Sequence, residues 1–140
     1  MQAVDKDIIF ETRLGLDLPN IRGDINKLEQ CFVNILNNAV DAVPREGRVT
    51  LESKVDSESQ NLLRIKISDT GEGISPENLG KIFNPFFTTK DVGKGTGLGL
   101  SISYGIVKDH GGQLEALSAE GEGTTFTITL PAEKEPEAEA

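Results

Sequence analysis

Apolar and polar residues alternate along five stretches of the chain, which is the pattern of strands with one buried face. The stretch 5–18 predicts a strand or a bent pair of strands, and the stretches 48–55 and 62–69 each predict a single strand. The stretches 113–118 and 124–130 follow one another closely enough to predict a hairpin. In the first stretch the alternating apolar residues are Ile8, Phe10, Leu14, Leu16 and Leu18.

Apolar residues recur three and four positions apart in two other segments, and this spacing predicts amphipathic helices. Asp24 is a good N-cap for the first helix, which we expect to end near Val43 because Pro44 follows. The second helix is expected to begin in the glycine-rich stretch 93–99 and to end near His110. The expected apolar faces are Leu28, Phe32, Ile35, Ala39 and Ala42 or Val43 in the first helix, and Leu100, Ile102, Ile106 and Val107 in the second.

The composition is that of one soluble domain, with 140 residues of which 36% are hydrophobic and 26% are charged. No apolar run approaches the ~18–20 residues that a membrane-spanning helix needs, and the N-terminus lacks the apolar centre of a secretory signal. The single cysteine, Cys31, excludes an internal disulfide and favours a reducing, cytoplasmic location. We expect one domain over 1–131 and a disordered acidic tail at 132–140. The lone histidine, His110, stands at a helix end, where we expect a structural role.

The stretch 90–110 carries the strongest candidate chemistry, because four glycines stand at alternate positions directly before a helix. They are Gly93, Gly95, Gly97 and Gly99. Glycines let the backbone approach a ligand closely, and a helix start presents unpaired amides and the positive end of the helix dipole. These features predict an anion site, most often for phosphate, although the glycine order fits neither a Walker A loop nor a dinucleotide fingerprint. The alternative is a flexible loop that caps an ordinary helix.

The net charge of −9, with no basic stripe along the sequence, makes nucleic acid an unexpected partner. An acidic protein must bind phosphate locally, with backbone amides, a few lysines and a metal ion. Asn34, Asn38 and Asp41 share one face of the first predicted helix, because they stand four and three positions apart. Two amide oxygens and a carboxylate suit a hard cation such as Mg²⁺, which takes oxygen ligands and keeps several waters. The alternative is a polar helix face that is simply hydrated.

Asp69 ends the predicted strand 62–69 on the same face as the apolar residues of that strand. An inward carboxylate is costly to bury without a partner. It stands beside the turn 70–73, where it could accept hydrogen bonds from an exocyclic amine such as that of adenine. The alternative is a strand-end aspartate that makes an Asx turn with its own backbone. Thr124 points inward in the same way at the start of the last strand.

The loop 75–96 joins the predicted strand 62–69 to the glycine-rich stretch, and we expect a helical turn within it at 77–83. Three of the six phenylalanines stand in this loop, just before Lys90: Phe83, Phe86 and Phe87. A long loop with aromatic anchors and glycine hinges is typical of a lid over a binding site. The alternative is that the phenylalanines pin the loop to the core, and both interpretations can hold together.

Taken in order, these motifs resemble the ATP-binding domain of sensor histidine kinases over about residues 5–131. The order is an asparagine-bearing helix (NILNNAVDA), a D-x-G-x-G turn (DTGEG), FNPFF, GKGTGLGL and a final GTTF strand. In that family these are the N, G1, F and G2 boxes, and the parent superfamily includes gyrase B, the Hsp90 chaperones and MutL. The segments PFFTTK and GTGLGLSI look like those of the nitrogen-regulation and dicarboxylate-sensing kinases.

The resemblance implies an α/β (α+β) two-layer sandwich, the Bergerat ATP-binding fold, with helices on one face of a mixed, mostly antiparallel sheet and a flexible ATP lid. It implies ATP and Mg²⁺ as cofactors, with Asn38 and Asn34 at the metal and the phosphates. Asp69 would accept the adenine amine, and Thr124 would support the base through water. The implied catalytic residues are Asn34, Asn38 and Lys90. The residues implied to bind the nucleotide are Asn34, Asn38, Asp41, Asp69, Gly71, Gly73, Ile74, Phe83, Phe86, Lys90, Lys94, Gly95, Thr96, Gly97, Leu98, Gly99, Leu100 and Thr124.

Asn34 bears on the type of reaction. The ATPases of the superfamily place a glutamate four residues before the metal-binding asparagine, as the general base for water. Here that position is Asn34, whose amide cannot take a proton at neutral pH. This favours phosphoryl transfer to an acceptor that brings its own nucleophile. Asp41 stands where some histidine kinases place a lysine or arginine, which weakens the case for a phosphate contact there.

We therefore expect the catalytic fragment of a larger protein-histidine kinase, without the phosphoacceptor histidine because His110 lies on the wrong helix. The resemblance implies two partners, the dimerisation helices of the parent kinase and, through phosphorelay, the receiver domain of a response regulator. The fragment alone is expected to be monomeric. Two alternatives remain, a serine protein kinase of the anti-sigma type with the same fold and a nucleotide-dependent binding module without transfer chemistry.

Overall fold

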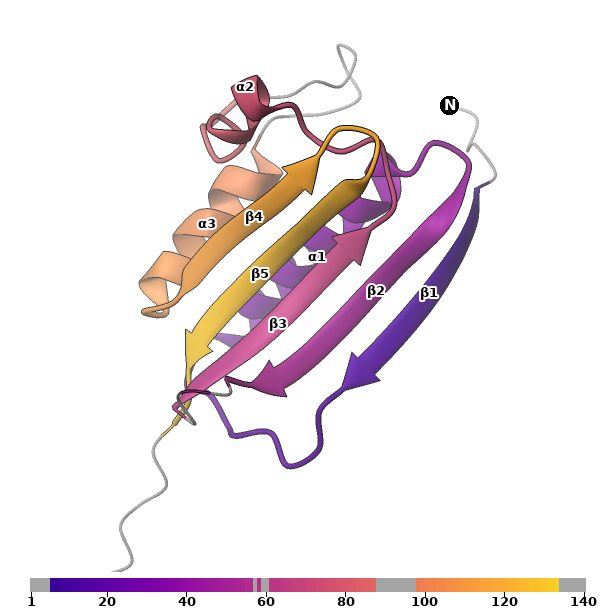
Figure 1. Ribbon diagram of the computed structural model, residues 1–140. Coiled ribbons are helices and arrows are strands. Elements are labelled where there is room, and N and C mark those ends of the chain that lie inside the picture. Colours follow the sequence, from indigo (N-terminus) through magenta and orange to yellow (C-terminus); the bar gives the residue numbers. More distant parts are fainter. Residues whose placement is uncertain (1–5, 57, 59–60, 88–97, 134–140) are drawn as a thin grey trace, which may run out of the picture.

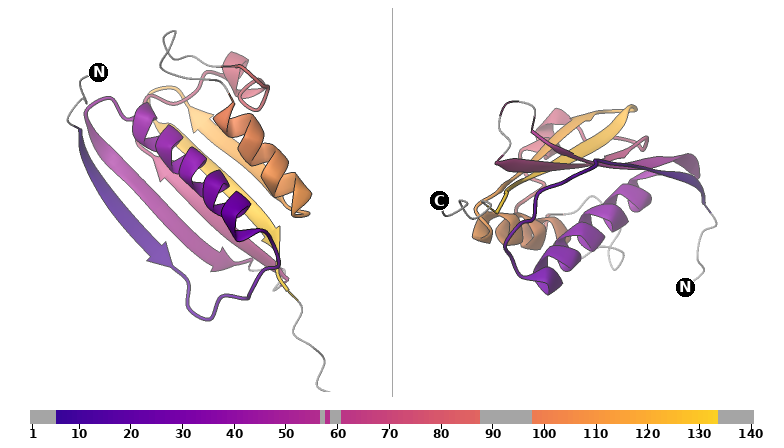
Figure 2. Two further views of the ribbon diagram at one scale, coloured as in Figure 1. Left: turned by 180° about the vertical axis from the view of Figure 1, so that it is seen from behind. Right: turned by 90° about the horizontal axis from the view of Figure 1, so that it is seen from below.

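The computed structural model describes residues 6–56, 58, 61–87 and 98–133. These residues form two layers, a five-stranded sheet and helices that cover one of its faces (Figure 1, Figure 2). The strands are β1 (Asp7–Leu14), β2 (Glu46–Val55), β3 (Leu62–Asp69), β4 (Gln113–Ala119) and β5 (Gly123–Pro131). The helices are α1 (Ile25–Ala42), the short α2 (Pro76–Leu79) and α3 (Gly99–Asp109).

The sheet has the strand order β1-β2-β3-β5-β4, in which only the β1–β2 pair is parallel. Parallel neighbours need a crossover, and α1 supplies it by running from β1 to β2 across the sheet. Both α1 and α3 lie on the same face, side by side (Figure 2). The structure thereby confirms the predicted two-layer fold with a mixed, mostly antiparallel sheet.

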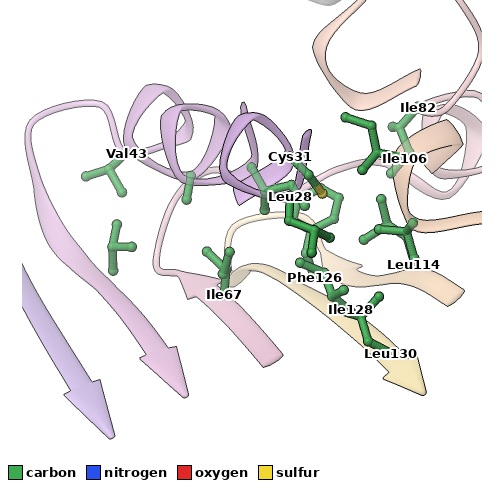
Figure 3. Packing of buried hydrophobic residues seen from close by; sticks show 14 residues of the cluster. Leu28, Cys31, Val43, Ile67, Ile82, Ile106, Leu114, Phe126, Ile128 and Leu130 are labelled. Carbon is green, nitrogen blue, oxygen red and sulfur yellow. The ribbon is translucent and has the colours of Figure 1, made fainter. Parts of the chain in front are cut away.

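The hydrophobic core lies between this helix pair and the inner face of the sheet, with Phe126 of β5 fully buried within it (Figure 3). The predicted stripe of α1 packs on the core, with Phe32 half-buried against it, but the prediction missed Cys31, which is fully buried. Cys31 faces α3, where its Sγ lies 3.8 Å from the carbonyl oxygen of Ser103. The prediction for α3 is wrong at Ile102, which is exposed, whereas Ser103 is fully buried. Small residues are buried at this point because the two helices approach each other closely.

The predicted strand over 5–18 is too long, because β1 ends at Leu14. The amide of Gly15 still donates to the carbonyl of Ser53 at 2.8 Å, but the chain then turns away through Asp17, which has a φ of 55°. Leu16 is 90% exposed as a result. The other bounds are close to prediction, and the strand predicted at 62–69 is correct at both ends. The helical turn predicted at 77–83 is the short helix α2 followed by turns.

His110 has the structural role that its position predicts. Its Nε2 accepts a hydrogen bond from the amide of Asp24 at 3.0 Å, and its Nδ1 lies 2.7 Å from the carbonyl oxygen of Ile106. The Nε2 that accepts this hydrogen bond carries no hydrogen, so in this arrangement Nδ1 is the donor to Ile106. Gly23 lies so close that a Cβ there would be 2.5 Å from the ring. His110 thus joins the end of α3 to the start of α1, where Asp24 is the N-cap.

His110→Phe should lower the free energy of unfolding by about 1–2 kcal/mol, because it removes two hydrogen bonds while keeping a ring of similar size. Urea unfolding followed by circular dichroism measures the change. Asp109→Ala, at the exposed neighbouring position, is the control and should change stability by less than about 0.5 kcal/mol. Equal effects of the two substitutions would contradict this role of His110.

Candidate functional site

Asp69, the last residue of β3, is a buried carboxylate with only one of its oxygens partnered. The residue is 6% exposed. Its Oδ1 accepts a hydrogen bond from the amide of Gly71 at 2.8 Å. Its Oδ2 has no hydrogen-bond partner among the described residues. Oδ1 makes the Asx turn of the first interpretation. The role of Asp69 as a ligand acceptor stays a prediction, for which Oδ2 is the available oxygen.

Burial raises the pKa of the Asp69 carboxyl above its ordinary value, and the backbone amides of Gly71 and Thr124, which favour the ionised form, offset part of that effect. A buried acceptor that lacks a partner costs about 1–3 kcal/mol. A donor from a ligand would satisfy Oδ2 and favour the ionised carboxylate. Titratable groups with shifted pKa values of this kind are typical of binding and catalytic sites.

The turn that follows β3 packs between the end of α1 and the end of β4. A Cβ at Gly71 would lie 2.4 Å from the carbonyl oxygen of Ala42, the last residue of α1. Gly73 has a φ of +75°, and a Cβ there would lie 2.1 Å from the carbonyl oxygen of Ala119 in β4. Both glycines are therefore required by the packing of the turn itself. At these two positions the turn therefore places only backbone atoms beside the buried carboxylate.

Thr124 lies opposite Asp69 in the β3–β5 pair and is buried, as predicted. Its Oγ1 lies 2.8 Å from the Oγ of Ser118, the residue opposite it in β4. The Ser118 Oγ also accepts a hydrogen bond from the amide of Ile74 at 2.7 Å and donates one to the carbonyl of Gly123 at 3.0 Å. A hydroxyl network therefore joins the turn after β3 to the β4–β5 hairpin.

The sequence analysis did not single out Ser118. The alternation of β4 contains the signal, because Ser118 has the same parity as the buried Leu114 and so lies on the inner face of the sheet. Its partner across the hairpin could be identified only once the register was known, and a serine beside a turn is otherwise unremarkable.

Asn34 and Asn38 are half-buried on α1, and Asp41 is exposed near the end of that helix. The Nδ2 of Asn34 donates to the carbonyl oxygen of Gly99 at 3.4 Å, which directs the amide nitrogen toward α3 and leaves Oδ1 as the potential metal ligand. The described residues hold no group of three or more His, Cys, Asp or Glu that could bind a metal ion. The oxygen ligands that this face offers are the two amide oxygens and the Asp41 carboxylate, which with water are ligands that Mg²⁺ accepts.

We call the α1 surface that carries Asn34, Asn38 and Asp41 the asparagine face. The start of α3 lies beside this face at Asn34. The helix begins at Gly99, within the predicted stretch, and Leu98 at the N-cap position has no side chain that can cap it. The Gly99 carbonyl accepts hydrogen bonds from Asn34 and, at 2.9 Å, from the Oγ of Ser103. Leu100 packs against the core. The structure therefore brings the first turn of α3 next to Asn34 of α1.

The phenylalanines of the loop have two different environments. Phe83 and Phe87 pack against the core, and the Phe83 ring centroid lies 5.1 Å from that of Tyr104. Phe86 is 74% exposed and has a φ of 67°, an uncommon conformation for a bulky residue. The loop is therefore pinned at Phe83, while Phe86 points away from the core.

Five predicted site residues lie outside the described part of the chain: Lys90, Lys94, Gly95, Thr96 and Gly97. Their roles and that of the predicted lid stay predictions. The same holds for residues 134–140 of the predicted tail.

Comparison with known families decides where the chain belongs. Residues 23–134 match the family described as histidine kinase-, DNA gyrase B- and HSP90-like ATPases. The chain belongs to this family. The match runs from the start of α1 to the end of β5, so it includes the asparagine face, the Asp69 turn and Thr124.

The curated relatives of this domain include sensor kinases and a sporulation kinase. It is 44% identical to sensor kinase CckA of Brucella abortus, over 93% of this chain and 15% of that protein. It is 41% identical to sensor histidine kinase ZraS of Escherichia coli, over 81% of this chain and 23% of that protein. It is 40% identical to sporulation kinase E of Bacillus subtilis, over 97% of this chain and 18% of that protein. The chain therefore spans less than a quarter of the length of these relatives.

Solved structures share the fold of this domain. The mycobacterial sensor histidine kinase MprB has a TM-score of 0.76 at 32% identity, over 90% of this chain and 83% of that one. The catalytic domain of histidine kinase ThkA has a TM-score of 0.73 at 35% identity, over 90% and 80%. Full-length ShkA in complex with AMPPNP has a TM-score of 0.77 at 29% identity, over 89% and 26%. The histidine-kinase catalytic fold predicted from the motifs is thereby confirmed. Among the described residues, no helix has the length and apolar character needed to cross a membrane.

Asp69→Asn should change how stability depends on pH. The pKa of Asp69 is raised in the folded protein, so its carboxyl favours folding below the ordinary aspartate pKa of about 4, and this contribution is lost as the pH rises through the raised value. The asparagine keeps the Oδ1 acceptor but cannot ionise. The unfolding free energy of Asp69→Asn relative to wild type should therefore rise with pH.

Urea unfolding of the ligand-free protein between pH 4 and pH 8 measures this difference. Asp109→Asn is the control, because Asp109 is exposed. If the difference in unfolding free energy between Asp69→Asn and wild type stays constant or falls as the pH rises, the pKa of Asp69 is not raised in the folded protein.

Proposed function

We propose that this chain is the ATP-binding catalytic domain of a sensor histidine kinase, which binds Mg²⁺-ATP and donates the γ-phosphate to a histidine on a separate dimerisation domain. The observation that carries the proposal is the buried carboxylate of Asp69, whose Oδ2 has no partner among the described residues. Membership of the histidine kinase-like ATPase family supports it, as do the names of the curated relatives.

The residues around Asp69 fit an adenine base. The exocyclic amine of adenine would donate to Oδ2 and supply the missing hydrogen bond. Gly71 and Gly73 would line the base with backbone, because their packing against Ala42 and Ala119 holds the turn beside the carboxylate. Ile74, half-buried at the end of this turn, would offer an apolar contact. Thr124 stands opposite Asp69, where it would support the base through water.

The phosphates would lie between α1 and the start of α3. Asn38 and Asn34 would hold Mg²⁺ through their amide oxygens, with Asp41 contributing at the edge of the same helix face. When bound, the metal ion would neutralise charge on the phosphates. Backbone amides at Leu98, Gly99 and Leu100 would face the phosphates, because they form the positive end of α3.

The glycine-rich stretch and its flanks would complete the site. We propose that Gly95, Thr96 and Gly97 wrap the phosphates and that Lys90 and Lys94 contact them. Together with Phe83 and Phe86 this stretch would form the lid. These residues carry over from the family resemblance, and the pinning of Phe83 to the core gives the proposed lid a fixed base.

The position of Asn34 favours transfer over hydrolysis. Asn34 already donates its amide nitrogen to the carbonyl of Gly99, and its amide oxygen is not a base at neutral pH. Water bound near the γ-phosphate would therefore lack a general base at this position. Phosphoryl transfer needs mainly alignment and charge neutralisation, and an acceptor histidine brings its own nucleophile.

The parent protein is part of the proposal. The chain spans less than a quarter of its curated relatives, so we propose that the phosphoacceptor helices lie elsewhere in a longer kinase. We propose that the phosphoryl group then passes to a response regulator, and that the parent belongs to the nitrogen-regulation and dicarboxylate-sensing subgroup. The domain at 1–131 would be cytoplasmic and monomeric by itself, with an acidic tail at 132–140.

Calorimetric titration with ATP, with and without Mg²⁺, tests the nucleotide site. Wild type should bind ATP, and Mg²⁺ should strengthen that binding. Asn38→Ala should lose about tenfold in affinity in the presence of Mg²⁺ and little in its absence, because it removes a metal ligand. Asn37→Ala is the matched control, since Asn37 is the exposed neighbour on another face of α1. Absence of ATP binding by wild type would contradict the proposal.

Transfer is tested by adding the separately expressed dimerisation domain of ZraS and γ-labelled ATP. The expected result is acid-labile label on the histidine of that domain, dependent on Asn38, with slow hydrolysis by the catalytic domain alone. Fast autonomous hydrolysis would contradict the role given to Asn34. ATP binding without transfer to this acceptor, or to the parent's own helices, would favour a nucleotide-dependent binding module. Label on a serine of a partner protein would favour the serine kinase.

A further inference from the structure

The two long helices cover only part of the inner face of the sheet. The main sheet contacts of α1 are with β3 and β5, and those of α3 are with β4 and β5. In Figure 2, no helix of the described residues lies over the edge strand β1. Packed helices lie about 10 Å apart and neighbouring strands about 4.8 Å apart, so one helix covers about two strands. Two helices therefore cover about four strands of the sheet and leave β1 bare.

The bare strand is apolar on this inner face. Phe10 and Leu14 have the same parity as Ile8, which packs against the core, and Phe10 lies beside the buried Val49 of β2. Yet Phe10 is 64% exposed and Leu14 is 61% exposed. Strand alternation therefore turns two large apolar side chains toward the helix layer at a place that the helices do not reach.

The neighbouring flank of α1 is apolar as well. Val33, Leu36 and Val40 stand three and four positions apart, on the side of the helix away from Asn34, which contacts α3. Lys6, just before β1, donates from its Nζ to the carbonyl oxygen of Val40 at 3.0 Å, so this flank lies beside β1. Extended apolar surface of this kind marks a contact site. We call the following residues the β1–α1 face: Phe10, Leu14, Val33, Leu36 and Val40.

The dimensions of the β1–α1 face fit one helix. Phe10 and Leu14 are four strand positions apart, which corresponds to about 13 Å. A helix spans that length in about nine residues. Over this distance an amphipathic helix offers apolar residues at i, i+3, i+4 and i+7, which would contact the flank of α1 and the inner face of β1 together. A helix in this position would complete the layer that α1 and α3 begin.

Charges at the two ends of the face indicate the direction of such a helix. Lys6 and Arg45 stand where β1 and β2 begin, and parity places both on the inner face of the sheet. Glu29 lies toward the other end, on the same flank of α1 as Val33. The C-terminal end of a helix carries partial negative charge and is stabilised by cations. A helix on this face should therefore end beside Lys6 and Arg45 and run antiparallel to β1.

We propose that the β1–α1 face is the docking site of an amphipathic helix of the parent chain, one that precedes β1 and ends shortly before Lys6. A helix that runs antiparallel to β1 and ends beside its first residues needs only a short connection to that strand. The chain spans less than a quarter of its curated relatives, which leaves length for such a helix. The inference rests on the longer parent that the proposed function includes, and not on the nucleotide site.

The docked helix would contact the helix that carries the proposed metal ligands. It would lie against the flank of α1 that faces away from Asn34, while α3 lies against the other flank. A displacement of the docked helix would thus act on the position of α1. The upstream chain would thereby be connected mechanically with the proposed site.

Cysteine labelling tests the inference. Leu14→Cys is placed in this chain and in the parent protein, and maleimide labelling at that position is followed by mass spectrometry. The parent should be labelled about tenfold more slowly, because the docked helix covers the position. Cys31 does not interfere, because it is fully buried. Leu117→Cys is the matched control, since Leu117 is also exposed but lies on the outer face of β4, and it should be labelled equally fast in both proteins.

Phe10→Glu in the parent should restore fast labelling of Leu14→Cys, because burying the new charge under the helix is costly. It should leave ATP binding unchanged, since Phe10 lies outside the proposed nucleotide site. Phe10→Ser is the milder variant if Phe10→Glu does not fold, and thermal unfolding of every variant checks the fold.

Three results would overturn the inference. Equal labelling of Leu14→Cys in the two proteins would show that nothing covers the face. Slow labelling in this chain alone, which becomes slower at higher protein concentration, would show that a second copy occupies it. Protection that survives deletion of the segment before β1 would assign the face to another part of the parent. ATP titration of the same parent keeps the two proposals apart, because protection without ATP binding supports the inference and contradicts the proposed function.

Discussion

A carboxylate held out of water at the end of β3 is the constraint on which the rest of the site depends. Asp69 ends a strand paired on both sides, so its side chain cannot leave the interior without breaking the sheet. The turn that follows satisfies one oxygen and the fold leaves the other without a partner among the described residues. Gly71 and Gly73 allow that turn to fit between α1 and the β4–β5 hairpin. The geometry of the proposed base site is therefore set by the sheet.

The helix pair fixes the second half of the site. α1 and α3 run antiparallel, and contacts at both ends and in the middle join them (Figure 2). The pairs are His110 with Asp24, Ser103 with Cys31, and Gly99 with Asn34. The last pair brings Asn34 to the first turn of α3. A change in the angle between the helices would separate the proposed metal ligands from the proposed phosphate site, so the small buried residues at the crossing also position the site.

Much of this arrangement follows from local pattern. Strand parity places Asp69 and Thr124 on the inner face, and the N-cap of α1 is the predicted Asp24. The failures concern residues whose position depends on distant partners. Full burial of Cys31 depends on where α3 crosses α1, and Ser118 acquires a partner only through the register of the hairpin. Spacing alone carries no information about such pairings.

The most direct test of the central claim follows the Asp69 carboxyl itself. The carboxyl carbon of Asp69, observed by NMR in selectively ¹³C-labelled protein, is titrated with acid in the absence and presence of saturating ATP. The pKa of Asp69 should be raised in the free protein and should fall when ATP binds, because a donated amine hydrogen favours the ionised form and little further desolvation is possible. An ordinary pKa in the free protein, or one that ATP leaves unchanged, would contradict the account.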